Sequence, residues 1–212
     1  MEQIDYFYLF TSLTVMLFSL TVHEAAHAWT AHRLGDPTAR LLGRISLNPA
    51  VHVDPVGTIL LPLVAMVTGA PLLGWAKPVP VDFRYLKQPR RDFMIIAAAG
   101  PASNLALAVV AAVVLRITPL APAADGIDIA SPAVAIALAA LRVNVLLALF
   151  NMIPVPPLDG GNVLGGLLPP HLADRFDALR PYGVFILYGL MFSGLLGRII
   201  SPPYHLIQSV LL

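Results

Sequence analysis

Long apolar stretches, separated by short segments rich in polar residues, proline and glycine, occupy most of the chain. The first runs over residues 6–33, and the others cover 56–76, 93–115, 132–153 and 182–197. A helix needs about 20 apolar residues to cross a bilayer, and each stretch approaches or exceeds that length. The pattern therefore predicts an all-α polytopic membrane protein with about five transmembrane helices.

The stretch 56–76 departs from the pattern of a simple crossing. It contains two prolines and three glycines, which interrupt helices. The basic segments 32–55 and 76–92 flank it, and Lys and Arg near membrane spans are retained on the cytoplasmic side. Because one crossing would place these two segments on opposite sides, we predict a re-entrant hairpin that enters the membrane and returns.

Two segments favour extended backbone. Residues 38–47 alternate in part between polar and apolar positions, which is typical of a strand. Residues 76–83 contain Pro-Val-Pro-Val, in which each proline restricts the preceding residue to extended angles. We therefore expect short β-strands in both segments, near the cytoplasmic face.

The composition agrees with a membrane protein and narrows its chemistry. Hydrophobic residues make up 58% of the chain and charged residues 12%, against about 45–50% and about 25% in soluble domains. The spans leave no room for a soluble domain, so residues 1–212 are expected to form a single integral-membrane domain. A net charge of +1 without a basic run argues against nucleic acid as a partner.

The distribution of basic residues predicts the orientation in the membrane. The linker 117–131 has no Lys or Arg, and residues 1–5 carry two acids without a basic partner. These segments are therefore expected outside the cytoplasm. The N-terminus would lie outside, and the first helix would end at the cytoplasmic face.

The first predicted helix carries the motif His23-Glu24-Ala25-Ala26-His27. Two histidines at positions i and i+4 share one helical face, where both can bind one Zn²⁺ while the adjacent Glu acts as general base. Ionisable groups inside an apolar span are costly and usually functional. The alternative is a solvated pair of histidines at the helix end, with Glu24 bonded to a neighbouring Arg.

A zinc hydrolase needs a third protein ligand. The chain has no cysteine, so this ligand must come from His or a carboxylate. Asp54 and Asp159 are the two acids that lie beside turn-forming residues next to apolar spans. Asp159 follows three prolines that break the fourth span, although an ordinary Asp-Gly turn is, for this residue taken alone, the more common interpretation.

Several motifs together resemble one known family. They are His-Glu-x-x-His at 23–27, Gly-Pro-Ala-Ser-Asn at 100–104 and the Asn-to-Asp-Gly segment at 151–160. In this order they resemble the site-2 protease family of intramembrane zinc metalloproteases, over about residues 20–168. The chain looks like the compact prokaryotic type without a PDZ domain, whose sequences also carry Asn-Pro-x-x-His-x-Asp-Pro, here at 48–55, and Gly-Trp-Ala-Lys-Pro-Val, here at 74–79.

The resemblance implies a site and a location. It implies that one Zn²⁺ is bound by His23, His27 and Asp159, that Glu24 is the catalytic base, and that Asn151 lies near the substrate carbonyl. It also implies a multi-pass protein of the prokaryotic cell membrane, with the active site toward the cytoplasm. The expected partners are the lipid bilayer and a transmembrane protein substrate.

Two further residues are weaker substrate-binding candidates. Asn104 lies one turn after the Gly-Pro break at 100–101 in the third span, where it would bond substrate or a zinc-bound water, or else serve as a structural amide between helices. His52 lies in an interfacial loop, where it would contact substrate or support a ligand, or else be merely solvated.

The predicted function is hydrolysis of peptide bonds within the transmembrane segment of a substrate. A metal-ion or proton transporter using the same His and Asp cluster is the first alternative, and an inactive membrane scaffold is the second. A transporter requires polar residues along the spans, and beyond Arg142 and Asn144 the sequence offers almost none.

Overall fold

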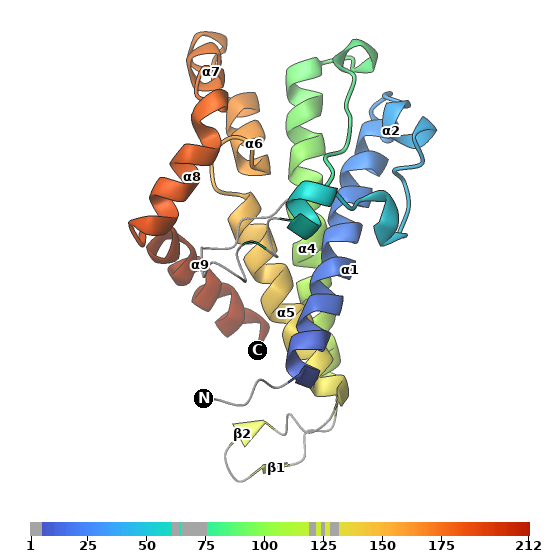
Figure 1. Ribbon diagram of the computed structural model, residues 1–212, viewed down its shortest axis with the longest axis vertical. Helices are drawn as coiled ribbons and strands as arrows, with labels where there is room; N and C mark the ends of the chain where they lie inside the picture. The colour runs from blue at the N-terminus through green and yellow to red at the C-terminus, as the bar shows by residue number, and fades with distance from the viewer. Residues whose placement is uncertain (1–5, 61–63, 65–75, 119–121, 124–125, 128–131) are drawn as a thin grey trace.

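The computed structural model describes residues 6–60, 64, 76–118, 122–123, 126–127 and 132–212. Three long helices pack side by side and form the centre of the molecule (Figure 1). They are α1 (Tyr6–Arg33), α4 (Pro89–Ile117) and α5 (Pro132–Asn151). Helix α4 starts with proline in its first turn, and the Asp92 side chain accepts from the Gln88 N–H at 2.8 Å, which caps the helix.

Short elements occupy the connections. Between α1 and α4 these are α2 (Thr38–Leu41), η1 (Pro49–Val51), η2 (Pro55–Leu60) and η3 (Phe83–Tyr85). Between α4 and α5, β1 (Pro122–Ala123) pairs antiparallel with β2 (Gly126–Ile127), with Pro122 opposite Ile127. After α5 come α6 (Asp159–Leu167), α7 (Pro170–Asp177), η4 (Arg180–Tyr182), α8 (Gly183–Phe192) and α9 (Leu195–Leu211).

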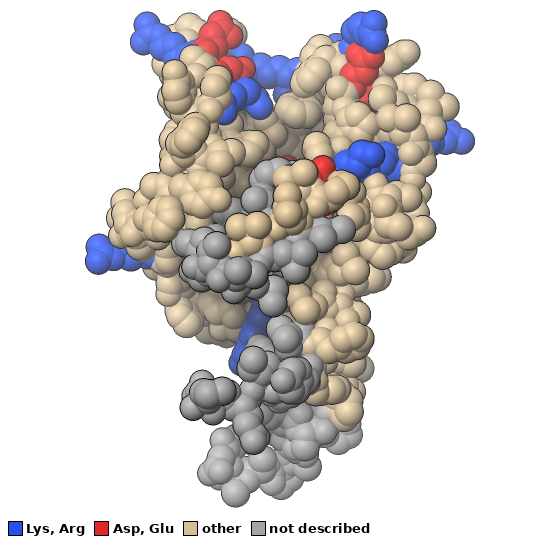
Figure 2. Space-filling model, viewed as in Figure 1, with Lys and Arg blue, Asp and Glu red and all other residues tan. Residues whose placement is uncertain are grey.

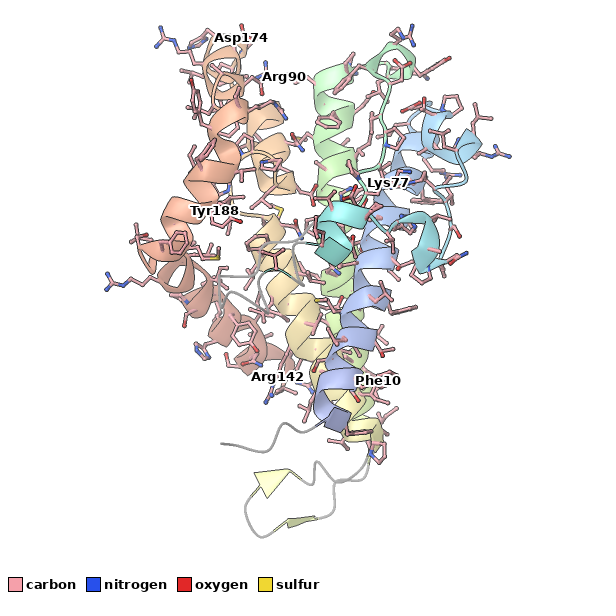
Figure 3. All side chains as sticks on the ribbon, viewed as in Figure 1. Phe10, Lys77, Arg90, Arg142, Asp174 and Tyr188 are labelled. Atoms are coloured by element: carbon pink, nitrogen blue, oxygen red, sulfur yellow. The ribbon has the colours of Figure 1, made fainter. Side chains whose placement is uncertain are left out.

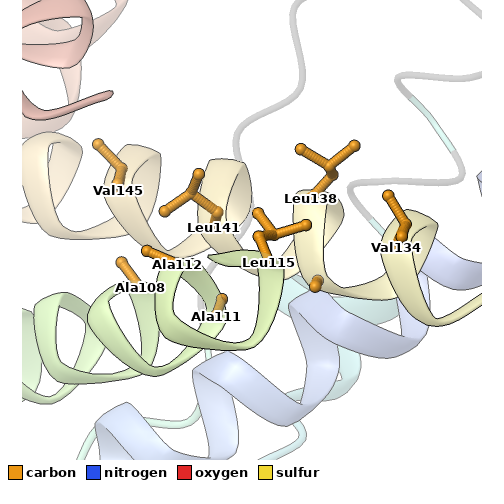
Figure 4. Close-up of a cluster of buried hydrophobic side chains, with 9 residues drawn as sticks. Ala108, Ala111, Ala112, Leu115, Val134, Leu138, Leu141 and Val145 are labelled. Atoms are coloured by element: carbon orange, nitrogen blue, oxygen red, sulfur yellow. The ribbon is translucent and has the colours of Figure 1, made fainter. Parts of the chain in front are cut away.

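An apolar core holds α4 against α5 (Figure 4). The α4 side is built mainly from alanines, and the α5 side from larger aliphatic residues such as Leu141 and Val145, both fully buried. Small residues on one helix allow the backbone of the other to approach closely. The buried residues of this core are Ala108, Ala111, Ala112, Leu115, Val134, Ala137, Leu138, Leu141 and Val145.

Among the described residues, which omit most of the predicted stretch 56–76, two or three candidate crossings are found, against about five predicted. The first predicted span has the bounds of α1, but only α4 and α5 qualify as long, apolar membrane helices among the described residues. A third crossing results if the helices over 170–192 and α9 form one broken span, bent by 78°. The predicted span 182–197 is therefore not one straight helix. Gly194 interrupts it with a φ of +73°, a left-handed conformation that glycine adopts without strain.

The predictions for the first connection are partly wrong. Residues 38–41 form helix α2 rather than a strand. The buried carboxylate of Asp36 accepts from Thr38 N–H at 2.9 Å, which favours a helix start at this point. Its other oxygen accepts from Asp82 N–H at 2.8 Å, and the Arg84 guanidinium lowers the pKa of Asp82 by bonding it.

The strand expected at 76–83 is not found either, because residues 76–82 form no strand ladder with any described segment. Apart from 56–60, 64 and 76, the predicted hairpin 56–76 lies outside the described residues.

Candidate metal centre

Helix α1 presents His23 and His27 on one face, as the spacing predicted. Both side chains are buried, and their Nε2 atoms lie 3.0 Å apart. His23 is ten residues from the end of α1, or about 15 Å along the axis. The pair therefore lies well inside the helix rather than at a solvated terminus.

Asp159 joins the two histidines from a distant part of the sequence. Helix α5 ends at Asn151, and the proline-containing turn that follows leads to Asp159 at the start of α6. The Asp159 Oδ2 atom lies 3.1 Å from Nε2 of His23 and 3.4 Å from Nε2 of His27. The break in the fourth predicted span thus returns a carboxylate to the first helix.

Hydrogen bonds on the far side of each imidazole determine which nitrogen is free. The Nδ1–H of His27 donates to the carbonyl of Ile96 at 2.7 Å, and the Nδ1–H of His23 donates to Asn104 Oδ1 at 2.6 Å. In the neutral imidazoles both Nε2 atoms are then unprotonated. Asp159 Oδ2 is buried and has no hydrogen-bond partner among the described residues.

These three electron-rich atoms suit one cation. Two bare nitrogens and a carboxylate oxygen repel one another at these distances unless a positive charge lies between them. Ligands of tetrahedral zinc, bound at about 2.0–2.1 Å, lie about 3.3 Å apart, close to the three separations found here. The His23, His27 and Asp159 cluster can therefore hold a metal ion.

Gly100 of α4 leaves room for this cluster. A Cβ atom at this position would lie 2.4 Å from Nε2 of His27 and 2.5 Å from Cε1 of His23. Any side chain would therefore occupy the space next to both ligand nitrogens. Pro101 follows within the helix and removes one backbone hydrogen bond there.

Glu24 and the cluster share a cavity of about 310 Å³. The half-buried Glu24 comes from α1, and the far wall is formed by α5 and the break after it, including Asn151 and Leu158. The segment 76–81 supplies Ala76, Pro78, Val79 and Val81 to the lining. A metal site with an acid beside it and open volume in front of it has the parts that a hydrolase requires.

A buried guanidinium fixes the segment that lines this cavity. Arg44 donates to the carbonyls of Val51, Lys77 and Pro78, and Lys77 N–H donates to the carbonyl of His52 at 2.8 Å. Lys77 is labelled in Figure 3, on the segment that leads to α4. Burial lowers the pKa of Arg44, and the negative charge of Glu24 opposes that shift.

Helix α6, which begins with Asp159, is attached to α4 by another arginine. Arg90 donates to the carbonyl of Gly165 in α6 from Nε at 3.0 Å and from Nη2 at 2.7 Å (Figure 3). Because Asp159 begins the same helix, this contact helps to fix the distance between Asp159 and the histidines of α1.

The other candidates from the sequence lie in different environments. Asn104 is fully buried and bonds His23, which favours a supporting role over direct contact with substrate. Asn151 lines the cavity and donates to the carbonyl of Leu147 at 3.0 Å. His52 is buried, and its Nε2 bonds the carbonyl of Ser46 at 2.9 Å. Asp54 accepts from Val56 and Gly57 N–H groups and lies outside the metal cluster.

Sequence reasoning gave no role to Ser19, Arg44 or Asn144, all of which are buried. A signal was available for Asn144, because an amide in the middle of an apolar helix is costly unless it is hydrogen-bonded. Arg44 stood among other basic residues of its segment, and Ser19 among the small residues of a span, so neither was distinctive in the sequence.

The fold and the site together define a class, a metallohydrolase with candidate membrane helices and an acid beside its metal ligands. Comparison with known proteins gives the family. The model of Peptidase family M50 matches residues 11–134, so the chain belongs to this family, the site-2 protease family of zinc metalloproteases.

Relatives agree with this membership. "Putative zinc metalloprotease YwhC" of Bacillus subtilis is 37% identical over 194 residues, which cover 89% of this chain and 82% of that protein. "Putative zinc metalloprotease Rip2" of Mycolicibacterium smegmatis is 29% identical over 86% of this chain and 66% of its own length. Rip2 of Mycobacterium tuberculosis H37Rv is 32% identical, and the chain spans 62% of it. No solved structure matches the chain.

Proposed function

We propose that this zinc metalloprotease cleaves peptide bonds within the transmembrane segments of its protein substrates. The observation that carries the proposal is the cluster of His23, His27 and Asp159 packed against α4, a candidate membrane helix, with Glu24 lining the same cavity. Protein substrates follow from family membership. In this proposal His23, His27 and Asp159 bind one zinc ion, and residues 1–212 act as one integral-membrane domain.

The side chains suggest a division of tasks in hydrolysis. When bound, zinc would polarise the scissile carbonyl and make a water molecule more acidic. Glu24 accepts the proton from the attacking water and returns it to the leaving amine. Asn151 lines the cavity on the α5 side, where its amide can bond the substrate carbonyl. Asn104 and Ile96 orient the two imidazoles.

The cavity favours an extended substrate over a helical one. A helix hides its carbonyls in internal hydrogen bonds, so the substrate must unwind before cleavage. Val79 and Val81 line the cavity, and neither makes a backbone hydrogen bond to another described residue. Their backbone groups can therefore pair with an unwound substrate as a strand does. Helix-breaking residues in the substrate would then promote cleavage.

The distribution of charge supports a cytoplasmic active site. The end of α1, helix α2, the start of α4 and helix α7 lie at one end of the molecule, opposite β1 and β2 (Figure 1). Most of the visible Lys and Arg side chains gather at that same end (Figure 2). Because basic residues beside spans are retained in the cytoplasm, this end faces the cytoplasm in our proposal and the N-terminus lies outside.

The proposal is tested with the detergent-purified chain and a model substrate that contains one transmembrane segment. We expect cleavage inside that segment, located by mass spectrometry and abolished by a chelator. Glu24→Gln should retain zinc and lose cleavage, while Asp174→Asn, at an exposed position on α7, should behave like the parent. Unreduced cleavage by Glu24→Gln would remove Glu24 from the mechanism. Cuts confined to the parts of the substrate outside its transmembrane segment would overturn the intramembrane assignment.

A further inference from the structure

A chain of buried polar side chains leads away from His23 into the bundle. Asn104 of α4, Asn144 of α5 and Ser19 of α1 are each at most 1% exposed. Asn104 Nδ2 donates to Asn144 Oδ1 at 2.9 Å, and Asn144 Nδ2 donates to Ser19 Oγ at 2.9 Å. The three long helices thus meet in one hydrogen-bonded network that ends on a proposed metal ligand.

Backbone carbonyls fix the direction of this network. Asn144 Nδ2 also donates to the carbonyl of Ala140 at 2.8 Å, and Asn104 Nδ2 to the carbonyl of Ser19 at 3.4 Å. A carbonyl only accepts, so each amide must turn its nitrogen toward that carbonyl. The Asn104 oxygen then faces His23 Nδ1, which must carry the proton.

The opposite arrangement would block the metal site. If the Asn104 amide were reversed, its nitrogen would face His23 Nδ1, which would have to act as acceptor. The imidazole proton would then lie on Nε2, the atom 3.1 Å from Asp159 Oδ2, where a metal ion needs a free electron pair.

We propose that Asn144 and Ser19 are positioning residues for the metal centre, because they hold the Asn104 amide in the one orientation that leaves His23 Nε2 free to bind zinc. They touch neither metal nor substrate and act through Asn104. This inference rests on the proposed zinc site. The competing explanation is that the network only joins three helices, as buried polar groups do in many membrane proteins.

The first test measures zinc affinity in the purified full-length chain. Groups that orient a ligand typically change metal affinity by about 10–100-fold. Accordingly, we expect Asn144→Leu to raise the zinc Kd by about tenfold and Ser19→Ala by a smaller factor. The matched control is Thr21→Val, because Thr21 is as buried as Ser19 on the same helix but, within the described part of the chain, its hydroxyl bonds only the carbonyl of Leu17, at 2.7 Å. Its zinc Kd should equal that of the parent.

The second test reads the imidazole directly, in metal-free protein labelled with ¹⁵N-histidine. The His23 signals are assigned by their loss in His23→Ala. In the parent and in Thr21→Val they should report a proton on Nδ1, and in Asn144→Leu a mixture of both forms. A purely structural network would lower the melting temperature without changing this ratio or the zinc Kd, and that result would overturn the inference. If Asn144→Leu fails to fold, Ser19→Ala decides by the same two measurements.

One further variant separates this inference from the function on which it rests. His23→Ala should lose zinc binding whether or not Asn144 has a positioning role. If His23→Ala binds zinc like the parent, the proposed metal site is wrong. If His23→Ala loses zinc while Asn144→Leu and Ser19→Ala match the parent in both measurements, only the positioning role is wrong.

Discussion

The two halves of the helix bundle are built on different physical principles. In the half around His23 and His27, α1 meets α4 through the hydrogen bonds of the two imidazoles, beside Gly100, where there is no room for a methyl group. In the half around Leu141, α4 meets α5 mainly through aliphatic side chains, and the Asn104–Asn144 hydrogen bond marks its border with the polar half. Metal binding in the first half depends on the positions of individual atoms. The stability of the second half depends on how well its side chains fill the space between the helices. Substitutions should therefore affect chemistry in one half and stability in the other.

The strongest test of this difference is Gly100→Ala. The added methyl group would lie 2.4 Å from His27 Nε2, far inside van der Waals contact, and would displace both imidazoles. We expect loss of stoichiometric zinc, measured by elemental analysis of the purified chain, together with loss of cleavage.

The matched control for Gly100→Ala is Gly189→Ala in α8, where an added Cβ meets nothing within 4 Å. Alanine in a helix is more favourable than glycine by about 1 kcal/mol, so this variant should keep its zinc and be as stable as the parent or more so. Parent-like zinc content in Gly100→Ala would contradict the close packing described for the metal centre.

The next largest effect on zinc binding is expected for Asp159→Asn. The amide keeps the shape of the side chain but removes the negative charge beside the two imidazoles, so zinc affinity should fall more than about tenfold. Asp54→Asn is the matched control, because Asp54 was the other candidate ligand and, among the residues that the structure describes, its Oδ1 accepts only from local N–H groups, at 3.0 and 2.7 Å. Titration with zinc compares the two variants, and the reverse order of affinities would reassign the third ligand.

Local spacing explains how much of the site could be predicted. His23, Glu24 and His27 lie within one turn and a half of helix, so their arrangement follows from helical geometry alone. Asp159 came from its setting beside prolines and from the family resemblance. Asn144 and Ser19 act through contacts between helices, at sequence separations of 40 and 125 residues, and no local pattern reports such contacts.

The fold shows the same division between local and long-range information. The hydropathy pattern predicted α1, α4 and α5 because a long apolar helix is recognisable from composition. It missed the helix at 38–41, where the buried Asp36 carboxylate bonds both Thr38 and the distant Asp82. It also missed the bend at Gly194, since a single glycine in an apolar stretch does not by itself indicate a left-handed residue.

The smallest effect on the metal site is expected from Leu141→Ala in the aliphatic half. Leu141 is fully buried among the alanines of α4, so truncation leaves a cavity and should lower stability by about 2 kcal/mol, the low end for such substitutions. Lipid is as apolar as the core, so packing rather than transfer from water accounts for most of this loss. The melting temperature in detergent should fall, while the zinc Kd of the folded protein stays at the parent value. A shift of the zinc Kd as large as that of Asn144→Leu would mean that the aliphatic core also positions the metal ligands, and the two halves would then not be independent.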